Sequence, residues 1–181
     1  FFVSRIDTLV DRRLEERALA ALAAVDEQER QRCLALRGRT AIANAKLAYE
    51  LFREMVSAPR WQRLAAAGAR PQRLLWASTS TKNPAYRDVV YAEQLIGPDT
   101  VDTMPPETLA AFRDHGVAHV TLTENVEQAR VDLAELESLG ISLATATDEL
   151  LEDGIRKFVQ PFEKLLATVA ARARELAERP A

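Results

Sequence analysis

The stretch Gln72–Pro84, with the sequence QRLLWASTSTKNP, decides the fold class. Its first part, 73–78 (RLLWAS), is a short and mostly apolar run, the pattern typical of a β-strand that is buried on both faces of a parallel sheet. Polar residues and then a proline follow at once, which predicts a loop at the carboxyl end of this strand. The stretch therefore indicates an α/β protein in which a polar loop over 79–84 follows a buried strand.

Two further short runs, 1–6 (FFVSRI) and 99–104 (DTVDTM), are also predicted to be strands. The other segments carry apolar residues at spacings of three and four, which is typical of amphipathic helices. We expect helices over 7–25, 40–56, 59–67, 87–95, 106–115, 124–139 and 150–178, with a polar stretch over 26–38. In the first helix Asp7 is expected to be the cap and Asp11 to lie on a charged outer face, and Pro161 is expected to kink or split the last helix.

The order of these elements indicates the topology of the sheet. Strands that alternate with helices imply a parallel sheet with right-handed crossovers. About three strands are too few for a parallel sheet that stands by itself, so the pattern favours part of a larger α/β barrel. The apolar run at Phe1, without an initial Met, fits a chain that begins inside a domain. We expect residues 1–181 to be one portion of a single barrel domain whose N-terminal part is missing.

The composition argues against several classes of protein. The 181 residues fit about one domain, and 48% hydrophobic residues are enough for a core. With 24 basic and 27 acidic residues, the net charge of -3 argues against nucleic acid or an anionic membrane as a partner. The apolar runs are far shorter than the ~20 residues that span a bilayer. The single cysteine, Cys33, excludes an internal disulfide, and we expect a cytoplasmic protein.

Histidine and cysteine side chains offer no strong catalytic or metal site. His115 and His119 have the spacing that places two zinc ligands on one helix face, but Gly116 interrupts that helix and no third ligand is evident. We expect two histidines that face solvent at a helix end, and no metal. Cys33 has no histidine near it in sequence and is expected to be a free structural thiol.

The four lysines do not include a convincing nucleophile. A lysine that forms an imine needs a desolvated pocket that lowers its pKa. Lys46, on the helix over 40–56, is expected to be structural and to extend its ammonium to the solvent from the edge of the core. Lys157 and Lys164 are expected to be solvated on the last helix, and Lys82 lies in the loop after a strand, where a cation suits phosphate binding better than imine chemistry.

Arg5, Ser80 and Lys82 are the candidate site residues, because each is expected at or just after the carboxyl end of a strand. In a barrel all these ends meet at one rim, and phosphate sites form there at the later strands. A guanidinium, a hydroxyl and an ammonium that converge can bind one phosphate through charge-assisted hydrogen bonds. The alternative, in which Arg5 and Lys82 pair with nearby carboxylates, stays open.

Four blocks of the chain resemble transaldolases. The blocks are 2–7 (FVSRID), 41–49 (AIANAKLAY), 72–84 and 97–105 (GPDTVDTMP), and they occur in the order of the family. The similarity extends through the C-terminal helix and therefore covers nearly the whole chain. It is greatest to the branch found in actinobacteria and cyanobacteria, which also occurs fused to glucose-6-phosphate isomerase.

The resemblance implies a (β/α)8 TIM barrel of the class I aldolase type, of which this chain is the helix-rich C-terminal part from strand six onward. Transaldolases transfer a dihydroxyacetone unit from sedoheptulose 7-phosphate to glyceraldehyde 3-phosphate, giving erythrose 4-phosphate and fructose 6-phosphate in the pentose phosphate pathway. A lysine Schiff base carries the unit, so the resemblance implies no cofactor and no metal. It also assigns Arg5, Ser80 and Lys82 to the substrate phosphate, with Lys82 where the better-known branch has arginine.

The chain departs from the family at the catalytic residues. The Schiff-base lysine and the acid/base carboxylates of the family lie on earlier strands, before the matched segment. No catalytic residue is therefore assigned here, and the chain by itself is expected to be inactive. Sugar phosphates are the expected ligands, and the resemblance allows a glucose-6-phosphate isomerase domain as a fusion partner. Two alternatives stay open, namely another imine-forming sugar-phosphate aldolase and a non-catalytic helical interaction module.

Overall fold

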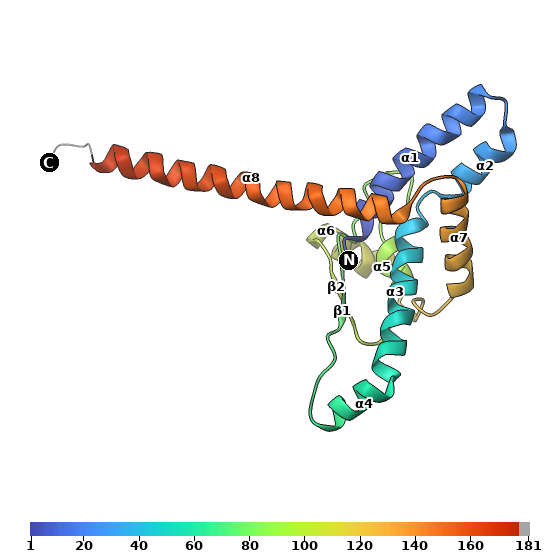
Figure 1. Cartoon of the computed structure of the whole chain (residues 1–181), viewed down its shortest axis with the longest axis horizontal. Helices are drawn as coiled ribbons and strands as arrows, with labels where there is room; N and C mark the ends of the chain where they lie inside the picture. Colours follow the sequence, from blue (N-terminus) through green and yellow to red (C-terminus); the bar gives the residue numbers. More distant parts are fainter. Residues whose placement is uncertain (178–181) are drawn as a thin grey trace. The chain divides into compact units, whose positions relative to one another are not determined.

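The computed structural model describes residues 1–177, apart from the side chain of Leu176. Helices and two parallel strands follow one another along the chain (Figure 1). In order, the elements are α1 (Val3–Ala23), α2 (Glu27–Leu36), α3 (Thr40–Ser57), α4 (Pro59–Ala66), β1 (Leu74–Ala77), α5 (Val90–Gln94), β2 (Thr100–Thr103), α6 (Pro106–His115), α7 (Val126–Ser138) and α8 (Leu143–Ala177). Residues 1–143 form one compact unit, and the chain from Ala144 onward belongs to a second one.

The sheet consists of β1 and β2, and its parallel topology is as predicted. In the β1–β2 pair, Leu74 lies opposite Thr100 and Ala77 lies opposite Thr103. On its other edge β1 meets the start of the chain. There the Ala77 N–H donates to the carbonyl oxygen of Phe1 at 2.8 Å, and Phe2 forms a parallel bridge with Ala77.

The predicted strand over 1–6 is wrong, because α1 already begins at Val3 and only Phe1 and Phe2 pair with β1. The described residues therefore contain two strands rather than the expected three. Aromatic and β-branched residues favour a strand only where the surroundings also do so. Here a helix buries the apolar side chains more completely, since the buried ones recur at helical spacing: Val3, Ile6, Val10 and Leu14.

The prediction that 73–78 is buried on both faces is also wrong. Trp76 is 1% exposed, and its indole N–H donates to the carbonyl oxygen of Leu95 at 3.1 Å. Leu75, which points to the opposite face, is 42% exposed. An apolar run predicts a strand but does not show how many of its faces are covered.

Most of the other predicted elements are confirmed, with small changes at their ends. The expected helices over 40–56, 59–67, 106–115 and 124–139 correspond to α3, α4, α6 and α7, and the strand over 99–104 corresponds to β2. The helix expected over 87–95 is shorter and is α5. The polar stretch over 26–38 contains α2, which forms because the Asp26 carboxylate accepts from the Glu29 N–H at 2.9 Å and caps the first turn.

The last helix, α8, continues from Leu143 to Ala177 without a break at Pro161, so the expected split is wrong. Its predicted end at residue 178 lies outside the described residues. The exposed Lys157 pairs with Asp153 one turn earlier. No helix in residues 1–177 combines the length and the apolar character that crossing a bilayer requires.

Candidate functional site

The loop between β1 and α5 carries two of the three predicted phosphate residues. It begins at Ser78, whose φ of +58° turns the chain out of the strand. The Lys82 ammonium donates to Ser80 Oγ at 2.9 Å, so these two polar groups are in direct contact beyond the carboxyl end of β1. Ser80 is half-buried and Lys82 is exposed, which leaves the ammonium accessible to an anion.

Arg5 lies in the first turn of α1 rather than at the end of a strand. Its guanidinium carbon is 4.6 Å from the centre of the Phe2 ring, a cation–π contact, and the side chain is half-buried. The N–H of the neighbouring Ser4 donates to the carbonyl oxygen of Ser78 at 3.0 Å, which joins this turn to the start of the loop. The structure thus places Arg5 on the element that adjoins the loop, but its guanidinium contacts Phe2 instead of the other two candidates.

Neither Arg5 nor Lys82 forms an ion pair with a carboxylate among the residues that the structure describes. Each cation instead contacts a neutral group: Lys82 donates to a hydroxyl, and Arg5 lies over an aromatic ring. Each therefore keeps the capacity to form charge-assisted hydrogen bonds with a phosphate.

Two aspartates for which we predicted a capping role and an exposed position lie buried on one face of α1. Asp7 is 1% exposed and Asp11 is 7% exposed, so the expected roles of cap and outer face are wrong. The hydroxyl of Tyr91 donates to Asp7 Oδ2 at 2.8 Å, and the hydroxyl of Tyr86 donates to Asp11 Oδ2 at 2.7 Å. Since α1 begins at Val3, both aspartates lie inside the helix at a spacing of four and therefore on the same face of it.

Burial changes the protonation of this cluster. Desolvation raises the pKa of Asp7 to about 7, although the hydrogen bonds from the Ala41 N–H and from Tyr91 act in the other direction. Burial also raises the pKa of Asp11, and it raises the pKa values of Tyr86 and Tyr91. At neutral pH, Asp7 is near the midpoint of its titration, so the cluster carries less negative charge than two ionised carboxylates would.

A cavity of about 300 Å³ lies between α1 and the loop. Asp7 and Asp11 line it from the helix, and Lys82, Asn83 and Tyr86 line it from the loop. The buried carboxylate–phenol pairs and Lys82, whose ammonium donates to Ser80, therefore line the same cavity.

Lys46 is a second buried polar group, and the prediction of a solvent-directed ammonium is wrong. Its side chain is 3% exposed, and Nζ donates at 2.8 Å to the carbonyl oxygens of both Thr121 and Glu124. Burial lowers the pKa of the ammonium. These bonds hold the loop before α7 against α3, which is the structural role that we predicted for this lysine.

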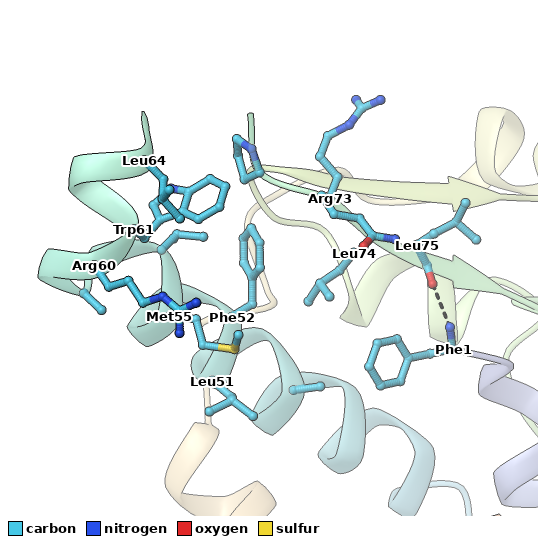
Figure 2. Close-up of a pocket in the computed structure, with 15 residues that line it drawn as sticks. Phe1, Leu51, Phe52, Met55, Arg60, Trp61, Leu64, Arg73, Leu74 and Leu75 are labelled. Carbon is cyan, nitrogen blue, oxygen red and sulfur yellow. Dashed lines mark hydrogen bonds between the residues drawn. The ribbon is translucent and has the colours of Figure 1, made fainter. Parts of the chain in front are cut away.

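A larger and mostly apolar groove, of about 960 Å³, lies between α3, α4 and the amino end of β1 (Figure 2). Met55 projects from α3, Trp61 from α4 and Leu75 from β1, and Met55 is 63% exposed. The backbone nitrogen of Phe1 donates to the carbonyl oxygen of Leu75 at 2.9 Å on one side of the groove. Few polar groups line this groove, so its chemistry suits apolar contact rather than catalysis.

The histidines and the cysteine are not candidate phosphate residues, although His115 contacts Asp88 near the end of the β1–α5 loop. His115 is the last residue of α6, and its ring lies 2.9 Å from Asp88 Oδ1 and 3.1 Å from Asp114 Oδ2, contacts that raise its pKa. His119 is exposed in the loop that follows, and Cys33 is buried and free. Within residues 1–177, no group of three or more His, Cys, Asp or Glu side chains is arranged to hold a metal ion.

Known proteins are similar to this chain over nearly its whole length. Residues 1–169 match the family described as Transaldolase/Fructose-6-phosphate aldolase. The chain is 51% identical to the Transaldolase of Parafrankia sp., over 93% of the chain and 43% of that protein. It is 40% identical to the Transaldolase of Trichodesmium erythraeum, over 97% of the chain and 46% of that protein, and 45% identical to the Transaldolase of Thermobifida fusca, over 94% and 44%. The chain thus spans less than half the length of these curated relatives.

Proposed function

The chain belongs to the transaldolase/fructose-6-phosphate aldolase family, and we propose that it supplies the phosphate-binding part of a transaldolase. The complete enzyme transfers a dihydroxyacetone unit from a ketose phosphate to an aldose phosphate in the cytoplasm. The family match confirms the predicted resemblance, and the names of the relatives support this reaction. Because the chain spans less than half of their length, the reaction is proposed for the complete enzyme and not for these residues alone.

The single observation that carries the proposal is the contact between Lys82 and Ser80 beyond the carboxyl end of β1. In (β/α)8 barrels the substrate lies at the carboxyl ends of the strands, and phosphate groups bind near the later strands. We propose that β1 and β2 are the seventh and eighth strands of such a barrel. The parallel pairing of β1 with β2 on one edge and with Phe2 on the other supports this assignment.

Each of the three residues has its own role in the proposed site. The Lys82 ammonium provides a point charge, and Ser80 Oγ provides a hydrogen bond to the same phosphate. Arg5 provides a planar guanidinium that can bind two phosphate oxygens, for which the side chain leaves the Phe2 ring and turns towards the loop.

The lysine that forms the Schiff base lies, in this proposal, in the part of the enzyme that the chain does not cover. The four lysines of the chain support this. Lys46 is buried with its ammonium bonded to two carbonyl oxygens, and Lys82 is exposed next to a hydroxyl. Lys157 and Lys164 are exposed on α8. Burial lowers the pKa of Lys46, but its ammonium donates to two carbonyl oxygens and lines no cavity with the proposed phosphate residues, and the other three lysines are not desolvated.

Calorimetric titration of the 181-residue chain with inorganic phosphate and with fructose 6-phosphate tests the proposal. Fructose without phosphate is the ligand control. Arg5→Ala and Lys82→Ala should each weaken phosphate binding by roughly tenfold or more, because each removes a charge-assisted hydrogen bond worth about 1.5–3 kcal/mol. Lys164→Ala, which removes an exposed lysine of α8, is the matched control and should leave the affinity unchanged. Absence of phosphate binding by the unaltered chain contradicts the proposal and favours the helical interaction module.

A second candidate is fructose-6-phosphate aldolase, because the description of the matching family includes that activity. The same phosphate site serves both reactions. An aldolase releases free dihydroxyacetone from fructose 6-phosphate, whereas a transaldolase keeps the unit bound until an aldose phosphate accepts it. Assays of the complete enzyme with and without erythrose 4-phosphate therefore distinguish the two.

A further inference from the structure

Two tyrosine–aspartate hydrogen bonds connect the far end of the β1–α5 loop and the start of α5 to α1. Tyr86 donates to Asp11 at 2.7 Å and Tyr91 donates to Asp7 at 2.8 Å. Both aspartates are more than nine-tenths buried, and Tyr91 is 2% exposed. Hydrogen bonds between a phenol and a buried carboxyl group have few competing water molecules, so they resist opening.

The second oxygen of each aspartate is also occupied. The Ala41 N–H donates to Asp7 Oδ1 at 2.8 Å, and the Gly38 N–H donates to Asp11 Oδ1 at 2.9 Å. A Cβ atom at Gly38 would lie 2.9 Å from the Tyr86 ring, so the ring packs directly against the backbone there. Each carboxyl group thus links three segments: Asp7 joins α1 to the first turn of α3 and to α5, and Asp11 joins α1 to the turn before α3 and to the loop. Neither group can rotate freely.

The near end of the loop is tied to the same helix. The Ser4 N–H donates to the carbonyl oxygen of Ser78 at 3.0 Å. The loop is therefore fastened to α1 before Ser80 and again after Lys82. The residues between the two attachments form one wall of the 300 Å³ cavity, and Asp7 and Asp11 form the other.

We propose that Asp7–Tyr91 and Asp11–Tyr86 are positioning pairs for the phosphate site. They hold the loop over 78–86 and the start of α5, which follows it, against the helix that carries Arg5, so that Lys82 and Arg5 can reach one phosphate group. The inference rests on the proposed function, because it assigns the loop to phosphate. The four side chains do not touch the phosphate, and they act through the position of Lys82 and Ser80.

The charges around these pairs do not provide a simpler explanation. Arg12 and Glu15 line the same cavity from α1, and Arg37 pairs with Glu15. Arg12 and Glu15 follow Asp11 along α1, and Arg37 directly follows α2. Lys82 donates to Ser80 instead of pairing with either aspartate. The pairs therefore do not serve to neutralise the lysine, and their visible effect is to fix the loop.

Tyr86→Phe and Tyr91→Phe, each measured for phosphate affinity by calorimetry and for stability by urea unfolding, test the proposal. Each variant should weaken the binding of inorganic phosphate by about threefold or more, because the loop samples positions in which its ammonium is misplaced. Tyr49→Phe is the matched control. Its hydroxyl donates to the carbonyl oxygen of Pro98 at 3.1 Å and its side chain is 4% exposed, so it loses a comparable hydrogen bond away from the loop. This control should lose stability but keep its phosphate affinity.

A double-mutant cycle separates positioning from a purely structural role. In the Lys82→Ala background, Tyr86→Phe should change the phosphate affinity much less than in the unaltered chain, because the ammonium that it positions is gone and only Ser80 remains to be positioned. Additive effects, or equal effects of Tyr49→Phe and Tyr86→Phe on the affinity, overturn the positioning role while phosphate binding by the unaltered chain keeps the proposed function intact. If the unaltered chain does not bind phosphate, the proposed function itself fails, and the positioning role fails with it.

Discussion

At its carboxyl end, β1 runs into a loop that is hydrogen-bonded to α1 at both of its ends, whereas at its amino end it borders an apolar groove (Figure 2). At the first end the buried polar groups find their partners within the chain, as Asp7 does in Ala41 and Tyr91. At the second end Leu75 and Met55 remain exposed. Over the four residues of β1, the neighbouring structure changes from buried polar groups with hydrogen-bond partners to exposed apolar side chains.

This contrast agrees with the proposed barrel. A polar site at the carboxyl ends of strands needs fixed partners, and here the chain itself provides them. The apolar groove instead exposes side chains of the kind that proteins bury against further elements. The following changes compare the two regions.

The largest effect is expected from Trp76→Ala, because this side chain is buried in the centre of β1. The lost packing, together with the unpaired carbonyl of Leu95, should lower the free energy of unfolding by about 3–5 kcal/mol. Trp61→Ala removes the half-buried tryptophan of the groove and is the matched control, with an expected loss below about 2 kcal/mol. Urea unfolding measures both, and equal losses would show that the groove is as well packed as the core.

The next effect is a pH dependence of the free energy of unfolding, which arises from Asp7 beside the loop and not from the apolar groove. The pKa of Asp7 is raised from 3.8 to about 7 by burial, so the folded state binds this proton more tightly than the unfolded state does. Its contribution to stability is fully present below pH 3.8 and is lost as the pH rises through about 7, a fall of about 3–4 kcal/mol. The Asp7→Asn variant should lack this fall. Parallel stability–pH curves for the two proteins between pH 4 and 8 would contradict the buried titration.

A smaller effect is expected at Lys46, which lies on α3 and lines neither the loop cavity nor the apolar groove. Lys46→Met keeps the apolar stem but leaves the carbonyl oxygens of Thr121 and Glu124 without their donor, at a cost of about 1–3 kcal/mol for an unsatisfied buried group. Phosphate affinity should be unchanged, since Lys46 is not part of the loop. Lys157→Met, on the exposed surface of α8, is the control that should change neither quantity. Reduction with borohydride in the presence of fructose 6-phosphate should leave Lys46 unlabelled.

The smallest effect is expected from Leu75→Ala in the groove. Because the side chain is 42% exposed, its removal should cost less than about 1 kcal/mol in the 181-residue chain. A loss of unfolding free energy as large as that of Trp76→Ala would mean that Leu75 is buried in solution, because other residues cover the groove. Thermal unfolding at several protein concentrations distinguishes closure within one chain from association between chains, since only association depends on concentration.

The sequence predicted the parts of the site that are contiguous. The order of an apolar run, hydroxyl residues, lysine and proline was enough to place Ser80 and Lys82 in a loop after β1. The helical spacing within 40–56 likewise predicted α3. In both cases the information lies within a few residues, where local periodicity and turn chemistry determine the structure.

The sequence did not predict the contacts that join distant segments. From the sequence, Asp7 resembles a helix cap and Asp11 a surface residue. A helical pattern alone does not show that their partners, Tyr91 and Tyr86, come from segments that lie far along the chain. One signal was present, since two carboxylates four residues apart share a face of the helix. The prediction that the Lys46 ammonium reaches the solvent was wrong for a similar reason, because its two carbonyl partners lie more than seventy residues away in the sequence.

The most direct test of the central claim is to map where fructose 6-phosphate binds, by following the backbone amide signals of the isotope-labelled chain during a titration. We predict that the changes gather in the loop over 78–86 and in the first turn of α1 around Arg5. Fructose without phosphate should not produce them. Changes that gather around Met55 and Leu75 in the groove, or no changes at the loop, would contradict the assignment of the phosphate site to the carboxyl end of β1.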